Sequence, residues 1–175
     1  MKRLSVLICF LLIPVSAFAN PPITIFSTAT PTVDTSAYAS GDLIGGKLTF
    51  NNALGDQSGT GAVNSIKIVD QAAQASDLDL VIFSSNPTNT TFTDQVALDI
   101  ADADLSKVVA VITLGSSTRF SFADNSVHYI GSLYIPVQGA TSNTVLYGAL
   151  VSRGTPTFAA STDVSVTLGV TPDSN

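Results

Sequence analysis

Short stretches in which apolar and polar residues alternate recur along the chain from residue 43 onward. In residues 78–83 the positions Leu78, Leu80 and Ile82 share one side, and residues 145–151 and 164–170 show the same spacing. A repeat of two residues is that of a β-strand with one buried face. The pattern predicts eight strands, at residues 43–50, 62–69, 78–83, 108–114, 119–122, 127–137, 144–151 and 164–170.

Turn-forming residues separate most of the predicted strands, because glycine, asparagine, aspartate and proline favour tight turns. Examples are Asn86-Pro87, Asp124-Asn125 and Gly154-Thr155-Pro156. The exception lies near residues 94–107, where Val96, Ile100, Ala103 and Leu105 permit one or two helical turns.

One buried face per strand is what two packed antiparallel sheets require. The predicted fold class is therefore all-β, and the closest architecture is a jelly-roll-like antiparallel β-sandwich of about eight strands. An immunoglobulin-like sandwich is the second choice. Residues 33–175 are expected to form this sandwich as one domain, which is long enough to bury a core.

The first 19 residues have the features of a signal peptide. Lys2 and Arg3 give a positive start, residues 6–15 are almost continuously apolar, and residues 17–19 read Ala-Phe-Ala, a small-x-small cleavage site. The apolar run is shorter than the roughly 20 residues of a membrane-spanning helix, and Pro14 interrupts it. We therefore expect the mature protein to begin at Asn20 and to carry no membrane segment.

Residues 20–32 are expected to form a proline-rich extended arm. Pro21, Pro22 and Pro31 surround a short apolar stretch, and proline is poorly suited to a helix or to a central strand. Such an arm is either a linker or a segment that reaches onto a neighbouring subunit.

Charge and composition exclude several classes of function. Two of the seven cations lie in the leader, which leaves five against thirteen aspartates, with no glutamate. Nucleic-acid binding is not expected, because phosphate contacts need clustered Lys and Arg. Charged residues make up only 11% of the chain, against about 25% in typical soluble domains, so something other than water is expected to cover part of the surface. Cys9, the single cysteine, leaves with the leader, so neither disulfides nor thiolate metal sites are expected.

No residue combination indicates an active site. A serine-type hydrolase needs a base, and His128, the only histidine, alternates onto the same face as Ile130 and Ser132, which favours a structural or surface residue. A glycosidase needs two carboxyl groups across a cleft, and aspartate pairs in loops are more often turn residues. We predict no enzyme activity and no catalytic or cofactor-binding residue. A secreted hydrolase that uses His128 or an aspartate pair is the least favoured alternative.

Asp99, Asp102 and Asp104 form the one local cluster of carboxylates with ligand-like spacing. Hard cations such as Ca²⁺ bind several carboxylate and carbonyl oxygens. The run lacks the glycine and the terminal glutamate of an EF-hand loop, and aspartates are also expected at helix starts. The sequence therefore predicts no metal site and favours a capping role, without deciding whether these three residues bind calcium.

Ten short segments, kept in order from residue 38 to residue 173, resemble a family of tailed-bacteriophage virion proteins. They are residues 38–46 (YASGDLIGG), 58–61 (SGTG), 65–70 (SIKIVD), 79–83 (DLVIF), 86–87 (NP), 91–94 (TFTD), 101–105 (ADADL), 146–151 (LYGALV), 153–157 (RGTPT) and 166–170 (VTLGV). The resemblance implies a small structural component that decorates or cements the phage head, and it brings no catalytic residues.

The expected function is therefore that of a non-enzymatic structural protein of a bacteriophage virion, which binds other capsid subunits and forms a homo-oligomer. The expected location is the virion. The leader departs from this picture, because head proteins assemble in the host cytoplasm. The alternative is a secreted or periplasmic bacterial binding or matrix protein with a phage-type sandwich.

Overall fold

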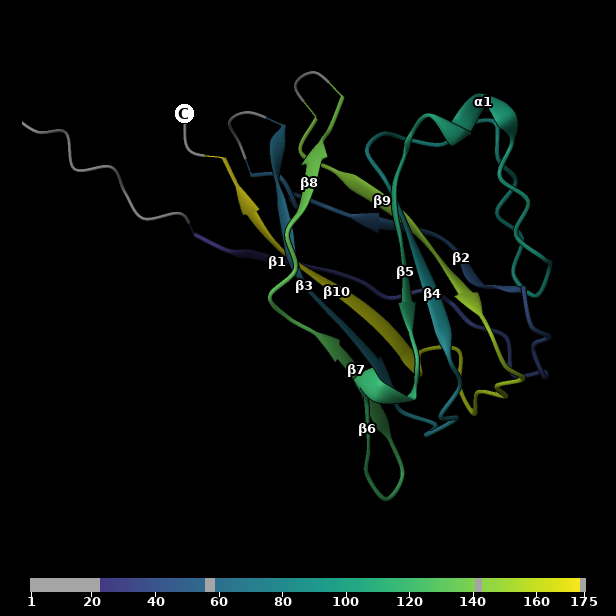
Figure 1. Ribbon diagram of the computed structural model, residues 1–175. Helices are drawn as coiled ribbons and strands as arrows, with labels where there is room; N and C mark the ends of the chain where they lie inside the picture. Colours follow the sequence, from purple (N-terminus) through teal and green to yellow (C-terminus); the bar gives the residue numbers. More distant parts are fainter. Residues whose placement is uncertain (1–22, 56–58, 141–142, 174–175) are drawn as a thin grey trace, which may run out of the picture.

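The computed structural model describes residues 23–55, 59–140 and 143–173, which form two antiparallel β-sheets packed face to face (Figure 1). The six-stranded sheet has the order β1-β10-β3-β7-β6, with β8 also paired to β3, and the four-stranded sheet has the order β2-β9-β4-β5. The strands are β1 (Ile25–Ala29), β2 (Leu43–Phe50), β3 (Thr60–Asp70), β4 (Leu78–Phe83), β5 (Val108–Leu114), β6 (Arg119–Ser121), β7 (Ser126–Ile130), β8 (Ile135–Gln138), β9 (Leu146–Ser152) and β10 (Val164–Pro172). The predicted all-β sandwich is confirmed, whereas the jelly-roll assignment stays a prediction.

The strand predicted at residues 127–137 is in fact two strands, β7 and β8, which both pair with β3. Ser132 interrupts the run with a φ of 58°, and the Leu133 N–H donates to the Asn64 carbonyl oxygen instead of continuing a ladder. Ile130, Leu133 and Ile135 all pack against the same core, but the step from Ile130 to Leu133 is three residues, so the inward-facing positions shift by one at the break. Periodicity alone therefore gave the wrong number of strands here.

The segment predicted as an arm is extended, and its residues Ile25–Ala29 are strand β1 of the sandwich itself. Each of them pairs with β10, from Ile25 opposite Val170 to Ala29 opposite Val166. An edge is where a proline-flanked strand fits, because proline cannot donate to a ladder. Residues 20–22 and the leader lie outside the described residues. Among the helices that the structure describes, none is long and apolar enough to cross a membrane.

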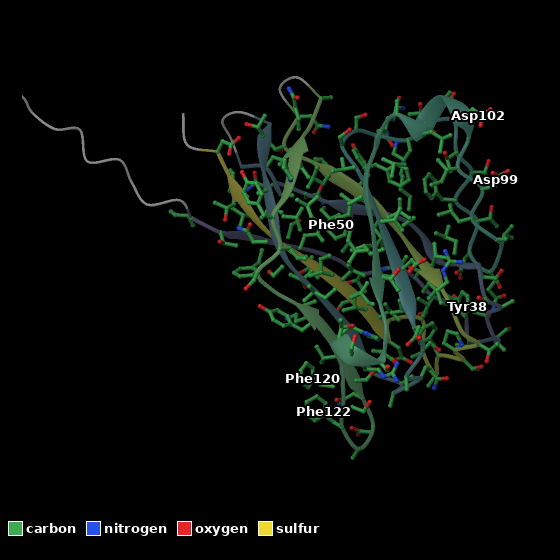
Figure 2. The ribbon with its side chains drawn as sticks, in the orientation of Figure 1. Tyr38, Phe50, Asp99, Asp102, Phe120 and Phe122 are labelled. Atoms are coloured by element: carbon green, nitrogen blue, oxygen red, sulfur yellow. The ribbon has the colours of Figure 1, made fainter. Side chains whose placement is uncertain are left out.

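The main core fills the space between the two sheets. Phe50 on β2 is fully buried and lies in this layer with Ile66 of β3, Leu80 of β4 and Leu168 of β10 (Figure 2). Each of these strands contributes alternate residues, as the sequence pattern predicted.

A second, smaller core lies on the outer face of the four-stranded sheet. Val81 and Phe83 of β4 are buried there beneath residues of the 84–107 connection, including Phe92 and Ile100. The rings of Phe83 and Phe92 meet edge to face with centroids 6.1 Å apart. The same connection carries α1 (Asp102–Leu105), a single turn that confirms the helix predicted near residues 94–107.

Candidate functional site

The outer face of the six-stranded sheet is the most distinctive exposed surface of the described residues. Strand register places Thr28, Thr167, Lys67 and Tyr129 in one row across four strands. The neighbouring rows hold Phe26, Gly169 and Ser65 on one side, and Phe120, Val127, Val69 and Ser165 on the other. We call this surface the aromatic face, after Phe26, Tyr129 and Phe120.

Large apolar side chains are unusually exposed on the aromatic face. Phe26 is 69% exposed, Phe120 60% and Tyr129 50%, although all three belong to regular strands. Lys67 is the one charged residue in the three rows. Grouped apolar exposure with few charges is characteristic of surfaces that bind another protein.

A shallow groove separates the Phe26 and Tyr129 rings. Its remaining lining comes from Thr28, Ser65, Lys67 and Thr167, and its volume is about 230 Å³. Gly169 lets the Phe26 ring lie against the sheet, since a Cβ there would come within 3.0 Å of Phe26 Cε1. Pockets that enclose small molecules measure roughly 300–1,000 Å³, so this groove suits a side chain of a partner better than a whole ligand.

The β6–β7 hairpin extends the aromatic face beyond the body of the sandwich (Figure 1). Phe120 and Phe122 lie on it near the tip, and the Phe122 N–H donates to the Asn125 carbonyl oxygen across the turn at 2.8 Å (Figure 2). Phe122 is 63% exposed. The hairpin therefore presents two aromatic rings where a neighbouring molecule can reach them.

The outer faces of the two sheets thus differ in whether another segment of the chain covers them. The 84–107 connection covers that of the four-stranded sheet, where Phe83 is fully buried. In the described part of the chain, no comparable segment covers Phe26, Tyr129 or Phe120. The aromatic face is thus the outer sheet surface that no described segment of the chain covers.

The three aspartates considered as calcium ligands serve different roles in the structure. Asp99 and Asp102 are exposed on the 84–107 connection (Figure 2), whereas Asp104 is fully buried. Asp104 accepts hydrogen bonds from the backbone N–H groups of Asn89 at 2.8 Å and Thr90 at 2.7 Å, and it pairs with Lys107 Nζ at 2.8 Å. No three carboxylate or histidine side chains of the described residues are placed to hold a metal ion.

Asp104 fixes the 84–107 connection onto the sheet, and its ionisation reflects this role. Burial opposes the charge, but hydrogen bonds from Lys107, Asn89 and Thr90 outweigh burial and hold the pKa of Asp104 well below its usual value. The contribution of Asp104 to stability is therefore present above about pH 4 and is lost as the pH falls toward its lowered pKa.

Asp104→Asn should loosen the 84–107 connection, because the amide cannot accept from every donor that now faces the carboxylate. We expect the melting temperature to fall by several degrees and hydrogen exchange to accelerate at the Asn89 and Thr90 amides. Asp102→Asn, an exposed change two residues earlier, is the matched control and should alter neither. Equal exchange rates in the two variants would show that Asp104 does not anchor the connection.

His128 is a core residue of β7. Its side chain is 1% exposed, and Nδ1 lies 3.2 Å from the Thr118 hydroxyl. The cavity that it lines together with Asp70 measures about 10 Å³, room for no more than one water molecule. The structure therefore places His128 facing inward with Ile130, while Ser132, expected on the same face, is exposed. In the part of the chain that the structure describes, no substrate-sized pocket lies beside His128.

Burial, followed by the positive charge of Arg119, lowers the pKa of His128 below its usual 6.5. At a pH between the lowered pKa of folded His128 and the usual 6.5 of the unfolded chain, only the unfolded chain binds a proton on this residue. The free energy of unfolding therefore decreases as the pH falls below 6.5. Urea titrations at pH 7.5 and 5.5 should show a loss of stability for the wild-type chain and a smaller loss for His128→Gln. Equal losses in both proteins would contradict a buried neutral His128.

Several other aspartates hold turns, as the excess of aspartate over glutamate suggested. Asp70 accepts from the Ala72 and Gln74 N–H groups at the end of β3. Asp163 accepts hydrogen bonds from the backbone N–H groups of Ala159 and Ala160, each at 2.8 Å. Asp79 differs, because it is buried on β4 and pairs with Arg153 at 2.6 Å.

Sequence reasoning missed the aromatic face, although a signal for it exists. Once His128 and Ile130 are assigned to the core, Val127 and Tyr129 must point the other way. Phe26 lay in the predicted arm, so its position beside Gly169 depended on the pairing of β1 with β10, which a residue pattern does not specify.

Comparisons with known proteins gave no match to this chain. No family model, no curated protein and no solved structure matches it.

Proposed function

We propose that this chain is a non-enzymatic structural protein of a bacteriophage virion, which decorates or cements the capsid through protein–protein contacts. The aromatic face carries the proposal, because three large rings from β1, β6 and β7 stay exposed on regular strands. The partner that suits it is a capsid subunit with an apolar, sparsely charged surface, since Lys67 is the one charge in these rows. The virion-like segments in the sequence support this class of partner.

The interior chemistry is compatible with a role based on contact alone. Asp70, Asp104 and Asp163 accept hydrogen bonds that fix turns and the 84–107 connection. His128 is enclosed in the core next to a cavity of about 10 Å³. These four titratable side chains thus have structural partners that account for their positions.

The test is incorporation of the chain into particles. The tagged protein is expressed in the phage's host, particles are isolated on a density gradient, and copies per particle are counted for wild type and for Phe26→Ser/Phe120→Ser. Buried aromatic contacts each contribute about 2 kcal/mol or more, so the double variant should lose about tenfold or more of its occupancy. Leu105→Ser, an equally exposed change on α1, should keep wild-type occupancy.

A wild-type chain that never sediments with particles would overturn the virion assignment. Full occupancy of the folded double variant would instead remove the aromatic face as the contact surface. Circular dichroism of each variant confirms folding, which is expected because these side chains are largely exposed.

A secreted or periplasmic binding or matrix protein is the second candidate, and the leader at residues 1–19 favours it. The aromatic face would then bind another exported protein. Mass spectrometry of the natural N-terminus separates the two candidates. A chain that begins at Asn20 in an extracellular fraction supports export, whereas an uncleaved chain in particles supports the virion.

A further inference from the structure

The exposed edges of the two sheets differ in how they are protected against pairing with another strand. An unprotected edge presents free backbone groups that recruit a further strand, and proteins block it with proline, short strands, bulges or charges. In the described structure, β1 lies between Pro22 and Pro31 in the sequence, β6 has three residues, and β8 contains Pro136. These three edges of the six-stranded sheet are poor templates for pairing.

One edge of the four-stranded sheet, β2, is already occupied. The Leu43 N–H donates to the Val96 carbonyl oxygen at 2.9 Å, and the Gln95 N–H donates to the Leu43 carbonyl oxygen at 3.0 Å. Further along, Gly45 and Gly46 have φ values of 71° and 82° and shift the register. The start of β2 is therefore paired with the 84–107 connection, and its middle is bulged.

The opposite edge, β5, has none of these protections over most of its length. Its seven residues, Val-Val-Ala-Val-Ile-Thr-Leu, include no charge, no proline and no glycine. Among the described strands β5 pairs with β4 alone, and the pairing is regular from Ala110 to Leu114. Val111 is 57% exposed. Such an edge is a template for strand addition.

Half-buried apolar side chains continue from β5 around the side of the sandwich. Val109 and Ile112 pack against the main core from the four-stranded sheet, and Ile130, Leu133 and Ile135 do so from the six-stranded sheet. None of the five is fully covered. A strand added at β5 would bury backbone groups and part of this apolar strip together.

We propose that β5 pairs with β5 of a second copy of this chain, antiparallel and about a twofold axis, so that two four-stranded sheets join into one. Full overlap of the two seven-residue strands places Val111 opposite Val111 and Lys107 opposite Gly115. A twofold contact of this kind is closed, so it stops at the dimer and does not build a fibre.

Charge complementarity favours a second copy as the occupant. The chain as a whole has a net charge of −6, so two copies can meet closely only where acidic groups do not oppose one another. Between residues 108 and 114 there is no charge to repel. At each end, Lys107 of one copy would lie near Asp77 of the other, whose carboxylate is 3.8 Å from the Cβ position of Gly115 and whose side chain is 52% exposed. Within each chain Lys107 Nζ lies 2.8 Å from Asp104 and Asp77 lies 3.3 Å from Arg119, so the contact between copies would join two existing ion pairs.

Sedimentation equilibrium of wild type, Val111→Lys and Val96→Lys tests this contact. The two variants carry the same change at similarly exposed valines, 57% and 52%, but only Val111 lies on the β5 edge. We expect the mass of two chains for wild type and Val96→Lys, and that of one chain for Val111→Lys. A wild type that is monomeric up to about 1 mM, or a folded Val111→Lys that remains dimeric, overturns the proposal.

A covalent test covers the possibility that Val111→Lys does not fold. In a Cys9→Ser background, Val111→Cys has one thiol per chain, and directly opposed residues of antiparallel strands lie about 4.5–5.5 Å apart at Cα, within disulfide range. Mild oxidation should give a disulfide-linked dimer as the main product. Absence of that dimer overturns the pairing. The β5 edge and the aromatic face lie on different sheets. A loss of dimerisation and a loss of particle occupancy can therefore be observed separately, so the two proposals can be rejected independently.

Discussion

Phe50→Ala should lower the free energy of unfolding by about 3–5 kcal/mol, the range for removing a buried aromatic ring from a packed core. Phe50 ends β2 and is fully buried between the two sheets. Its ring packs against the backbone of β9, since a Cβ on Gly148 would come within 3.0 Å of Phe50 Cε2. The cavity left by alanine lies between two hydrogen-bonded sheets, which cannot close together to fill it.

Urea unfolding of wild type and Phe50→Ala at pH 7.5 measures this loss. Phe122→Ala makes the same chemical change at a ring that is 63% exposed and should cost no more than about 0.5 kcal/mol. A loss below about 1 kcal/mol for Phe50→Ala would mean that the two sheets do not pack through this ring.

Gly45→Ala should lower the free energy of unfolding by about 3 kcal/mol, the second-largest loss among the substitutions considered. Gly45 has a φ of 71°, where an L side chain costs about 1–2 kcal/mol. A Cβ at Gly45 would also lie 2.3 Å from Cβ of Pro31, so the chain that follows β1 must move. Overpacking of this kind adds about 1–3 kcal/mol.

Gly46→Ala provides a neighbouring control for the steric part of this loss. Its φ of 82° imposes a similar backbone strain, but the nearest atom to a Cβ there is the Phe92 carbonyl oxygen at 3.8 Å. Thermal unfolding should therefore rank wild type above Gly46→Ala and Gly46→Ala above Gly45→Ala. Equal melting temperatures for the two variants would show that Pro31 does not approach Gly45 closely.

Strand positions were predictable where apolar residues recur at every second position, whether or not the other face is also buried. Leu80 and Ile82 on β4 and Leu168 on β10 follow the period of two and lie in the core. The same rule miscounted strands at residues 127–137, where the inward positions change from even numbers in β7 to odd numbers in β8 across the break at Ser132.

Features that depend on distant pairing could not be predicted from the sequence. Strand β1 exists because β10 offers it a partner about 140 residues away, and the prolines around it indicated only that it would be extended. The position of Asp104 beside Asn89 and Thr90 is likewise tertiary, and its spacing with Asp99 and Asp102 did not indicate that it anchors the 84–107 connection.

Hydroxyl-radical footprinting of particles that carry the protein, compared with the free chain, tests most directly whether the aromatic face is the contact surface. Phe26, Tyr129 and Phe120 are at least half exposed in the free chain and should become strongly protected in the particle. Leu105 on α1, 53% exposed, should react equally in both states. Unchanged oxidation of all three aromatic residues in assembled particles would contradict the account.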